Sequence, residues 1–178
     1  SSLYQLKKAE VSIEELLFDI NGKFTNNKES SFMNLNIKGR NIDLQTAFSI
    51  FPKEYFETLS EYKASGMVVF ETTIEGVISK DSSPRIVSDF TLQNGSLTEK
   101  QTGAHLNKLS LEGHFESRNK KNQEEITFKN INGVLENGKI KGNVLISNFE
   151  NPSVKADLSG NLSMAKIKQF INSEKIET

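Results

Sequence analysis

The strongest constraint on the fold is an alternation of apolar and polar residues with a period of two. It is clear near the C-terminal end, where Val154, Ala156, Leu158, Gly160 and Leu162 share one parity and polar residues hold the other. Successive side chains of a β-strand point to opposite faces of the sheet. This period therefore predicts strands with one apolar face and one solvated face.

A hairpin and a helix flank this alternating segment. Asn137-Gly138 lies between two apolar-alternating stretches, which is a strong signal for a tight hairpin turn in which the glycine adopts a positive φ. At Ser163, a good N-cap, the period changes to about 3.6 residues, with Met164, Ile167 and Ile171 at helical spacing. We expect a short amphipathic helix near residues 163–172.

The same alternation recurs along the rest of the chain. It predicts one strand over residues 11–24, an antiparallel partner over 32–39, a long strand over 68–78, and further strands over 86–92, 108–117 and from 126 onward. Asn94-Gly95 predicts another turn. The fold class that follows is mainly β, with some helix.

Between residues 43 and 62 the period becomes helical. Asp43 is an N-cap candidate, and Pro52 restarts the pattern, so two short helices should meet at a bend. The apolar residues that should pack these helices on the sheet are Phe48, Phe51, Phe56 and Leu59.

Two parts of the chain resemble each other. The pattern from Phe18 to Phe24 is similar to the one from Leu109 to Phe115, and each half ends in a capped helix. The spacings are unequal, so two repeats over about 11–62 and 65–172 and a chance similarity of amphipathic strands both remain open.

Composition excludes several classes of function. The 22 Lys and Arg residues balance 23 Asp and Glu residues, which gives no field for nucleic acid. The absence of cysteine excludes disulfides and thiolate chemistry. No run approaches the roughly 18 apolar residues of a membrane-spanning helix, and the first residues resemble no export signal. Any such signal or anchor is expected outside these 178 residues.

No catalytic or metal-binding constellation is evident. His105 and His114 have opposite parity on one strand and so would not converge on a metal without a bulge. The serine-rich turns lack a nucleophile elbow and a paired base. We expect no catalytic residues, no metal site and no cofactor.

The apolar strand faces are too extensive for the few predicted helices to cover. Either the curved antiparallel sheet of hairpins folds over into a sandwich, which composition favours, or it forms a groove whose apolar lining meets a ligand. The residues that parity assigns to one continuous lining are Phe18, Ile20, Phe24, Phe70, Ile74, Ile86, Phe90, Leu92, Leu109, Leu111, Phe115, Val144, Ile146 and Leu158.

The order of these motifs resembles a known family. It is carried by Asn41-Ile42-Asp43-Leu44 with the following helix, by Ser65-Gly66-x-x-x-Phe70, and by the spaced Gly, Leu and Phe residues that continue to Leu158-x-Gly160-x-Leu162. It is similar to the C-terminal region of AsmA-like proteins, the bacterial envelope relatives of TamB and of bridge-like lipid-transfer proteins. The resemblance covers most of the chain.

This resemblance implies a role. It suggests one β-rich segment, residues 1–178, of a longer periplasmic protein that is anchored to the inner membrane outside this segment. Such a protein would carry phospholipid or another acyl-chain ligand between membranes, or contribute to outer-membrane assembly, without catalysis. The alternative is a structural β-sandwich domain of the envelope that binds a protein partner and carries no lipid.

Overall fold

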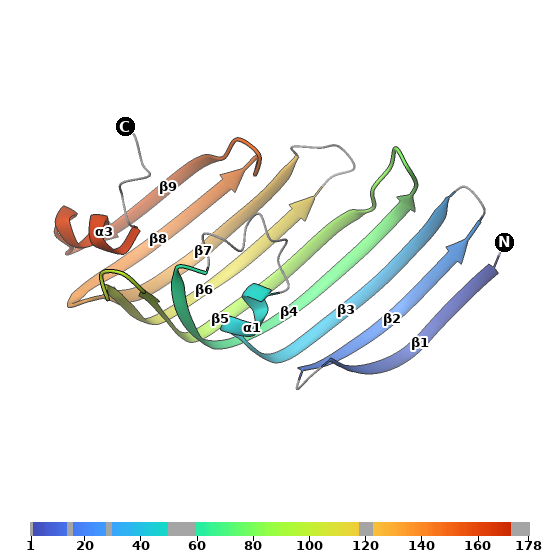
Figure 1. The fold of residues 1–178 in the computed structure, drawn as a ribbon, viewed down its shortest axis with the longest axis horizontal. Helices are drawn as coiled ribbons and strands as arrows, with labels where there is room; N and C mark the ends of the chain where they lie inside the picture. Colours follow the sequence, from blue (N-terminus) through green and yellow to red (C-terminus); the bar gives the residue numbers. More distant parts are fainter. Residues whose placement is uncertain (1, 14–15, 28–29, 50–59, 118–122, 172–178) are drawn as a thin grey trace.

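The structure is a computed structural model that describes residues 2–13, 16–27, 30–49, 60–117 and 123–171. Figure 1 shows an extended sheet with two short helices. The elements in chain order are β1 (Ser2–Ile13), β2 (Leu16–Asn26), β3 (Ser31–Asp43), α1 (Leu44–Ser49), β4 (Tyr62–Ile78), β5 (Arg85–Glu99), β6 (His105–Ser117), β7 (Glu124–Leu135), β8 (Gly138–Ser147), β9 (Ser153–Gly160) and α3 (Met164–Ile171).

The strands form one antiparallel sheet in the order in which they occur along the chain. Each strand pairs with its neighbours in sequence from β1 to β9, so the mainly β, antiparallel prediction is confirmed. Among the described residues there is one sheet and no second layer of strands, so the folded-over sandwich is not formed. The sheet includes strands from both predicted repeats, and the repetition itself stays a prediction.

The single strand predicted over residues 11–24 is wrong. Val11 pairs with Phe18 across a hairpin, because a separate strand, β1, precedes β2. A bulge between Leu6 and Ala9 shifts the register of β1. The apolar residues of β1 are therefore even-numbered before the bulge, at Tyr4 and Leu6, and odd-numbered after it, at Ala9 and Val11. Because the alternation is broken, a period of two over the whole segment does not reveal this strand.

Two predictions from Asn-Gly pairs also need correction. Asn94-Gly95 does not reverse the chain: β5 continues through it, and Asn94 has a φ of 52° in a bulge. The hairpin after β7 is confirmed, but its left-handed residue is Glu136 with a φ of 54°, and Gly138 has no positive φ. Gly138 is instead a position of close approach, because a Cβ there would collide with Leu162.

Bulges lie in five consecutive strands and bend the sheet. The register shifts fall at Asn41 in β3, Gly66 in β4, Asn94 in β5, Lys108 in β6 and Asn130 in β7, each of which has a positive φ. Bulges increase local twist and curvature. The strands curve accordingly toward the end where α1 lies (Figure 1).

The buried core lies at that bulged end, here called the closed end. Ile42 is fully buried there, and Val68 and Leu92 are less than a tenth exposed. The residues of the two helices and their flanks that pack over this cluster are Leu44, Ala47, Phe48, Leu162, Ile167 and Phe170. The helices thus cover the apolar face at one end of the strands.

Each of the two helices begins with an N-cap residue. The backbone N–H of Thr46 donates to Asp43 Oδ1 at 3.1 Å, and that of Lys166 donates to Ser163 Oγ at 3.4 Å, which confirms both predicted N-caps. The first helical region is shorter than predicted, because Tyr62 begins β4. The predicted contacts of Phe51, Phe56 and Leu59 lie outside the described residues.

The C-terminal half of α3 is held by side chains of β4 and of the loop after β5. Tyr62 Oη donates to the carbonyl of Phe170 at 2.8 Å, and Thr102 Oγ1 lies 3.1 Å from that of Gln169. Thr102 belongs to a loop organised by Glu99, whose side chain is 0% exposed. The Glu99 carboxylate accepts hydrogen bonds from the backbone N–H groups of Gln101 and Thr102 and from the Thr102 hydroxyl.

Candidate functional site

Strand register brings all fourteen predicted lining residues to one face of the sheet. Directly opposed residues of antiparallel neighbours point to the same side. A continuous row of opposed residues crosses eight strands and is called the aromatic row: Phe18, Gly39, Phe70, Phe90, Gly113, Phe128, Val144 and Ala156. The other predicted lining residues lie in parallel rows on the same side.

Two glycines of the aromatic row lie beneath phenylalanine rings. A Cβ on Gly39 would collide with the Phe70 ring, and one on Gly113 would collide with the Phe90 ring. The Phe18 and Phe70 rings approach to 6.2 Å across Gly39, between ring centroids. Phe90 and Phe128 meet edge to face at 6.1 Å across Gly113. The Phe70 and Phe90 rings therefore pack directly over the glycine backbone of the neighbouring strand.

The predicted lining divides into two groups by burial. Phe18, Leu92 and Leu109 belong to the closed-end core and are 8%, 4% and 4% exposed. Four half-buried members pack against that core: Ile20, Phe70, Phe90 and Leu111. The first group therefore serves mainly to pack the fold.

The second group lies outside that core cluster and is called the open end. Its members are Phe24, Ile74, Ile86, Phe115, Val144, Ile146 and Leu158. Six of them are half-buried, and Leu158, on the edge strand, is 48% exposed. Neither described helix packs on this group, although Phe115 has a ring contact with Phe149 at 6.1 Å.

Several further apolar residues lie on this face beside the fourteen predicted ones. Tyr4 and Leu6 of β1 oppose Phe24 and Gly22 and are 58% and 44% exposed, but the β1 bulge hid them. Other apolar residues of this face could have been predicted from the sequence, because they alternate with the remaining residues of their own strands. These are Met33, Leu35, Ile37, Ile126, Phe128 and Val154.

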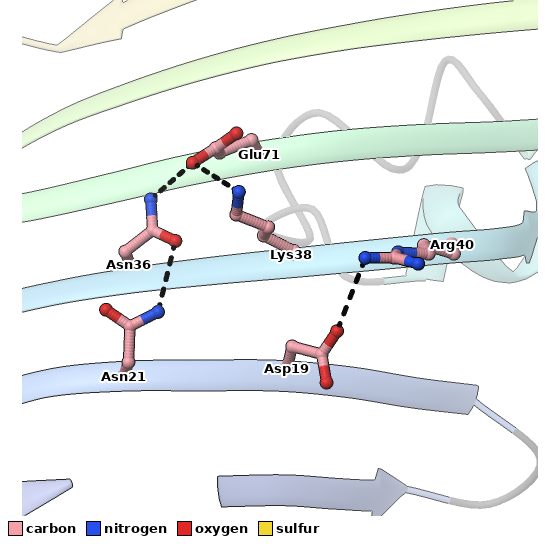
Figure 2. Close-up of polar contacts among 6 residues, drawn as sticks. All are labelled: Asp19, Asn21, Asn36, Lys38, Arg40 and Glu71. Carbon is pink, nitrogen blue, oxygen red and sulfur yellow. Dashed lines mark hydrogen bonds and ion pairs between the residues drawn. The ribbon is translucent and has the colours of Figure 1, made fainter. Parts of the chain in front are cut away.

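The opposite face of the sheet, here called the polar face, carries charged and amide side chains that are tied together across strands, beside exposed apolar side chains such as Leu17 and Val69. The Glu71 carboxylate lies 2.8 Å from Asn36 Nδ2 and 3.1 Å from Lys38 Nζ (Figure 2). The Asn36 hydrogen bond, and then the Lys38 contact, hold the pKa of Glu71 below its usual range. Arg40 Nη2 lies 3.9 Å from Asp19 Oδ2 on the same face. These charged and amide side chains thus lie on the face opposite the aromatic row.

The two histidines lie on one strand and have separate partners. The Nδ1 of His105 is 2.8 Å from Thr98 Oγ1, and that of His114 is 2.7 Å from Asp89 Oδ1. Within the described part of the chain, no three His, Asp or Glu side chains gather in a way that could hold a metal ion.

In the part of the chain that the structure describes, neither helix has the length and apolarity needed to cross a bilayer.

The candidate site is therefore the open end of one apolar sheet face, which the aromatic row joins to the closed core, since that row includes Phe18 of the core and Val144 of the open end. Comparison with known proteins adds no relative: no protein-family model, no curated protein and no solved structure matches this chain.

Proposed function

We propose that this chain is a non-catalytic segment of a bacterial envelope protein whose sheet carries phospholipid or another acyl-chain ligand on its apolar face. The proposal rests on where the helices lie on the apolar face. The described helices pack on the apolar face at the closed end, and the same apolar rows continue from there to the open end, where the Phe149 ring contacts Phe115. Contiguous exposed apolar surface on a protein marks an interaction site.

The chemistry of the open end suits hydrocarbon. Its side chains are aliphatic or aromatic, such as Phe24, Ile74, Ile86 and Ile146. They can therefore make dispersion contacts with acyl chains and need no hydrogen-bond partner. Each buried methylene contributes about 0.8 kcal/mol, so an acyl chain laid along the strands gains substantial free energy. A headgroup would stay in water beside the sheet, and selectivity among headgroups should be weak.

The envelope setting belongs to the same proposal. The likeness of the motif order to AsmA-like proteins supports the periplasm as the location, with an inner-membrane anchor outside residues 1–178. Transport between membranes and outer-membrane assembly are the processes in which such a surface would act.

Photocrosslinking from adjacent residues tests the proposal. A photoreactive amino acid at Ile74 would point into the open end, whereas one at Thr73, its neighbour in β4, would point to the polar face. In bacterial cells that produce the protein, irradiation should attach phospholipid to the Ile74 variant and much less to the Thr73 variant, as mass spectrometry would measure.

A second matched pair guards against a local effect. Ile86 opposes Ile74 on the apolar face, and Val87 follows it on the other face. Equal lipid labelling from both faces, or none from either, would rule out lipid carriage. Crosslinks from Ile74 and Ile86 to a protein, without lipid, would favour the structural or partner-binding alternative.

A further inference from the structure

The two edges of the sheet differ in their regularity. The edge strand β1 is interrupted by its bulge between Leu6 and Ala9. The other edge strand, β9, pairs with β8 without interruption from Ser153 to Gly160, and all eight of its residues are exposed. None of the described residues pairs with the outer side of β9. A regular, exposed edge is a template for another strand.

Hydrogen bonding shows which backbone groups of β9 face outward. The N–H of Asn161 donates to the carbonyl of Lys139 at 3.2 Å, continuing the ladder between β8 and β9. Backbone groups in a strand alternate in direction, so those of residues 153, 155, 157 and 159 face β8. The N–H and C=O groups of Val154, Ala156 and Leu158 therefore point away from the sheet. Pro152, which has no N–H, limits the ladder at one end.

The sequence of β9 is complementary to itself in an antiparallel arrangement. If Ala156 lies opposite Ala156 of a second copy, Lys155 lies opposite Asp157, and Val154 lies opposite Leu158. The outward-facing groups of residues 154, 156 and 158 then hydrogen bond across the junction. We propose that β9 is a homodimerisation edge at which two copies of this chain join their sheets about a two-fold axis through Ala156.

Charge and apolar pattern select this register. A shift of the copies by two residues in either direction places Lys155 opposite Lys155 or Asp157 opposite Asp157, and directly opposed like charges are destabilising. In the proposed register the Lys155–Asp157 pairs lie on the polar face. Val154 and Leu158, which are 59% and 48% exposed, meet on the apolar face. The two apolar faces therefore join on one side of the combined sheet.

The chain after β9 does not occupy this edge with a further described strand. The hydrogen bonds from Tyr62 and Thr102 to the last turn of α3 hold that helix toward β4 and the loop after β5. The chain thus crosses back over the sheet once β9 is complete.

Charge reversal tests the interface. Lys155→Asp and Asp157→Lys each place two like-charged pairs across the junction, and each should raise the dimer dissociation constant about tenfold or more at low salt. The double variant K155D/D157K restores opposite charges and should restore dimerisation. Sedimentation velocity of the 178-residue chain over a concentration series measures both effects.

A remote charge reversal supplies the control. Lys23→Asp makes the same change at an exposed position in β2 and should leave the dimer unchanged. Wild-type protein that stays monomeric up to its solubility limit would overturn the proposal. Single variants that dimerise like the wild type, or a double variant that stays monomeric, would also overturn it.

Single cysteines test the register, since the natural chain has none. In Ala156→Cys the two sulfurs would meet at the two-fold axis, within the Cα separation that a disulfide spans, and mild oxidation should give a covalent dimer. Val154→Cys, on the same face, would lie four residues from its copy and should crosslink far less. Preferential crosslinking through residue 154 would overturn the proposed register.

Discussion

At the scale of single residues, Gly113 shows how a missing side chain shapes the apolar face. The Phe90 ring occupies the space that a Cβ on Gly113 would need. We predict that Gly113→Ala displaces this ring and lowers the free energy of unfolding by about 1–3 kcal/mol, because inserting a methyl group into packed surroundings forces its neighbours to move. Urea denaturation measures the change.

The same ring offers the control for this substitution. In a Phe90→Ala background the added methyl group of Gly113→Ala has room, and alanine in a strand is about 0.5–1 kcal/mol more favourable than glycine. The double-mutant cycle should therefore be strongly non-additive. Additive effects of the two substitutions would show that the ring and the glycine are not coupled.

At the scale of elements, Glu99 joins a loop to a helix. Its carboxylate accepts hydrogen bonds from the Thr102 hydroxyl and N–H and from the Gln101 N–H, and the Thr102 hydroxyl also contacts the carbonyl of Gln169 in α3. The hydrogen bonds from Thr102, and then that from Gln101, hold the pKa of Glu99 below its usual range. The ionised carboxylate thus stabilises the folded state.

The sign of this shift gives a prediction about pH. Because the folded-state pKa of Glu99 is lowered, its stabilisation is complete above the ordinary carboxyl pKa of about 4.3 and is lost as the pH falls through the folded-state value. Glu99→Gln should therefore lower the melting temperature at neutral pH, and its deficit relative to the wild type should shrink in acid. Thermal unfolding at a series of pH values measures this.

A carboxylate elsewhere on the sheet separates this effect from the loss of one negative charge. Glu125→Gln removes the same charge at an exposed position in β7 and should change the melting temperature little at neutral pH. A deficit of Glu99→Gln that stays constant from neutral pH into acid would contradict the assigned role of the ionised carboxylate.

Across the whole molecule, the apolar face is buried in the closed core and more exposed elsewhere. Leu92, which is 4% exposed, lies in the closed core, whereas Leu6 lies on the same face in β1 and is 44% exposed. We predict that Leu92→Ala lowers the free energy of unfolding by about 2–5 kcal/mol, since it leaves a cavity, and that Leu6→Ala costs much less. Urea denaturation of both variants measures the contrast, and equal losses would contradict the division of the face.

The amino-acid pattern was enough to predict antiparallel strands with one apolar face. Side chains of a strand alternate between the two faces of the sheet, whichever strand lies beside it. Residues such as Phe70, Phe90 and Ile146 could therefore be assigned to a common face from the sequence. The caps at Asp43 and Ser163 were equally readable, because a cap depends on residues within one turn.

The turns, the bends and the burial of particular apolar residues depend on contacts between strands and helices, and the sequence alone did not predict all of them. Asn94-Gly95 and Asn137-Gly138 look alike in sequence, yet one forms a bulge and the other a hairpin, because the neighbouring ladder determines whether the strand continues. The β1 bulge likewise shifts the apolar parity locally and conceals that strand. The division into a core and an open surface depends on where α1 and α3 pack, which is a matter of contacts between residues far apart in the chain.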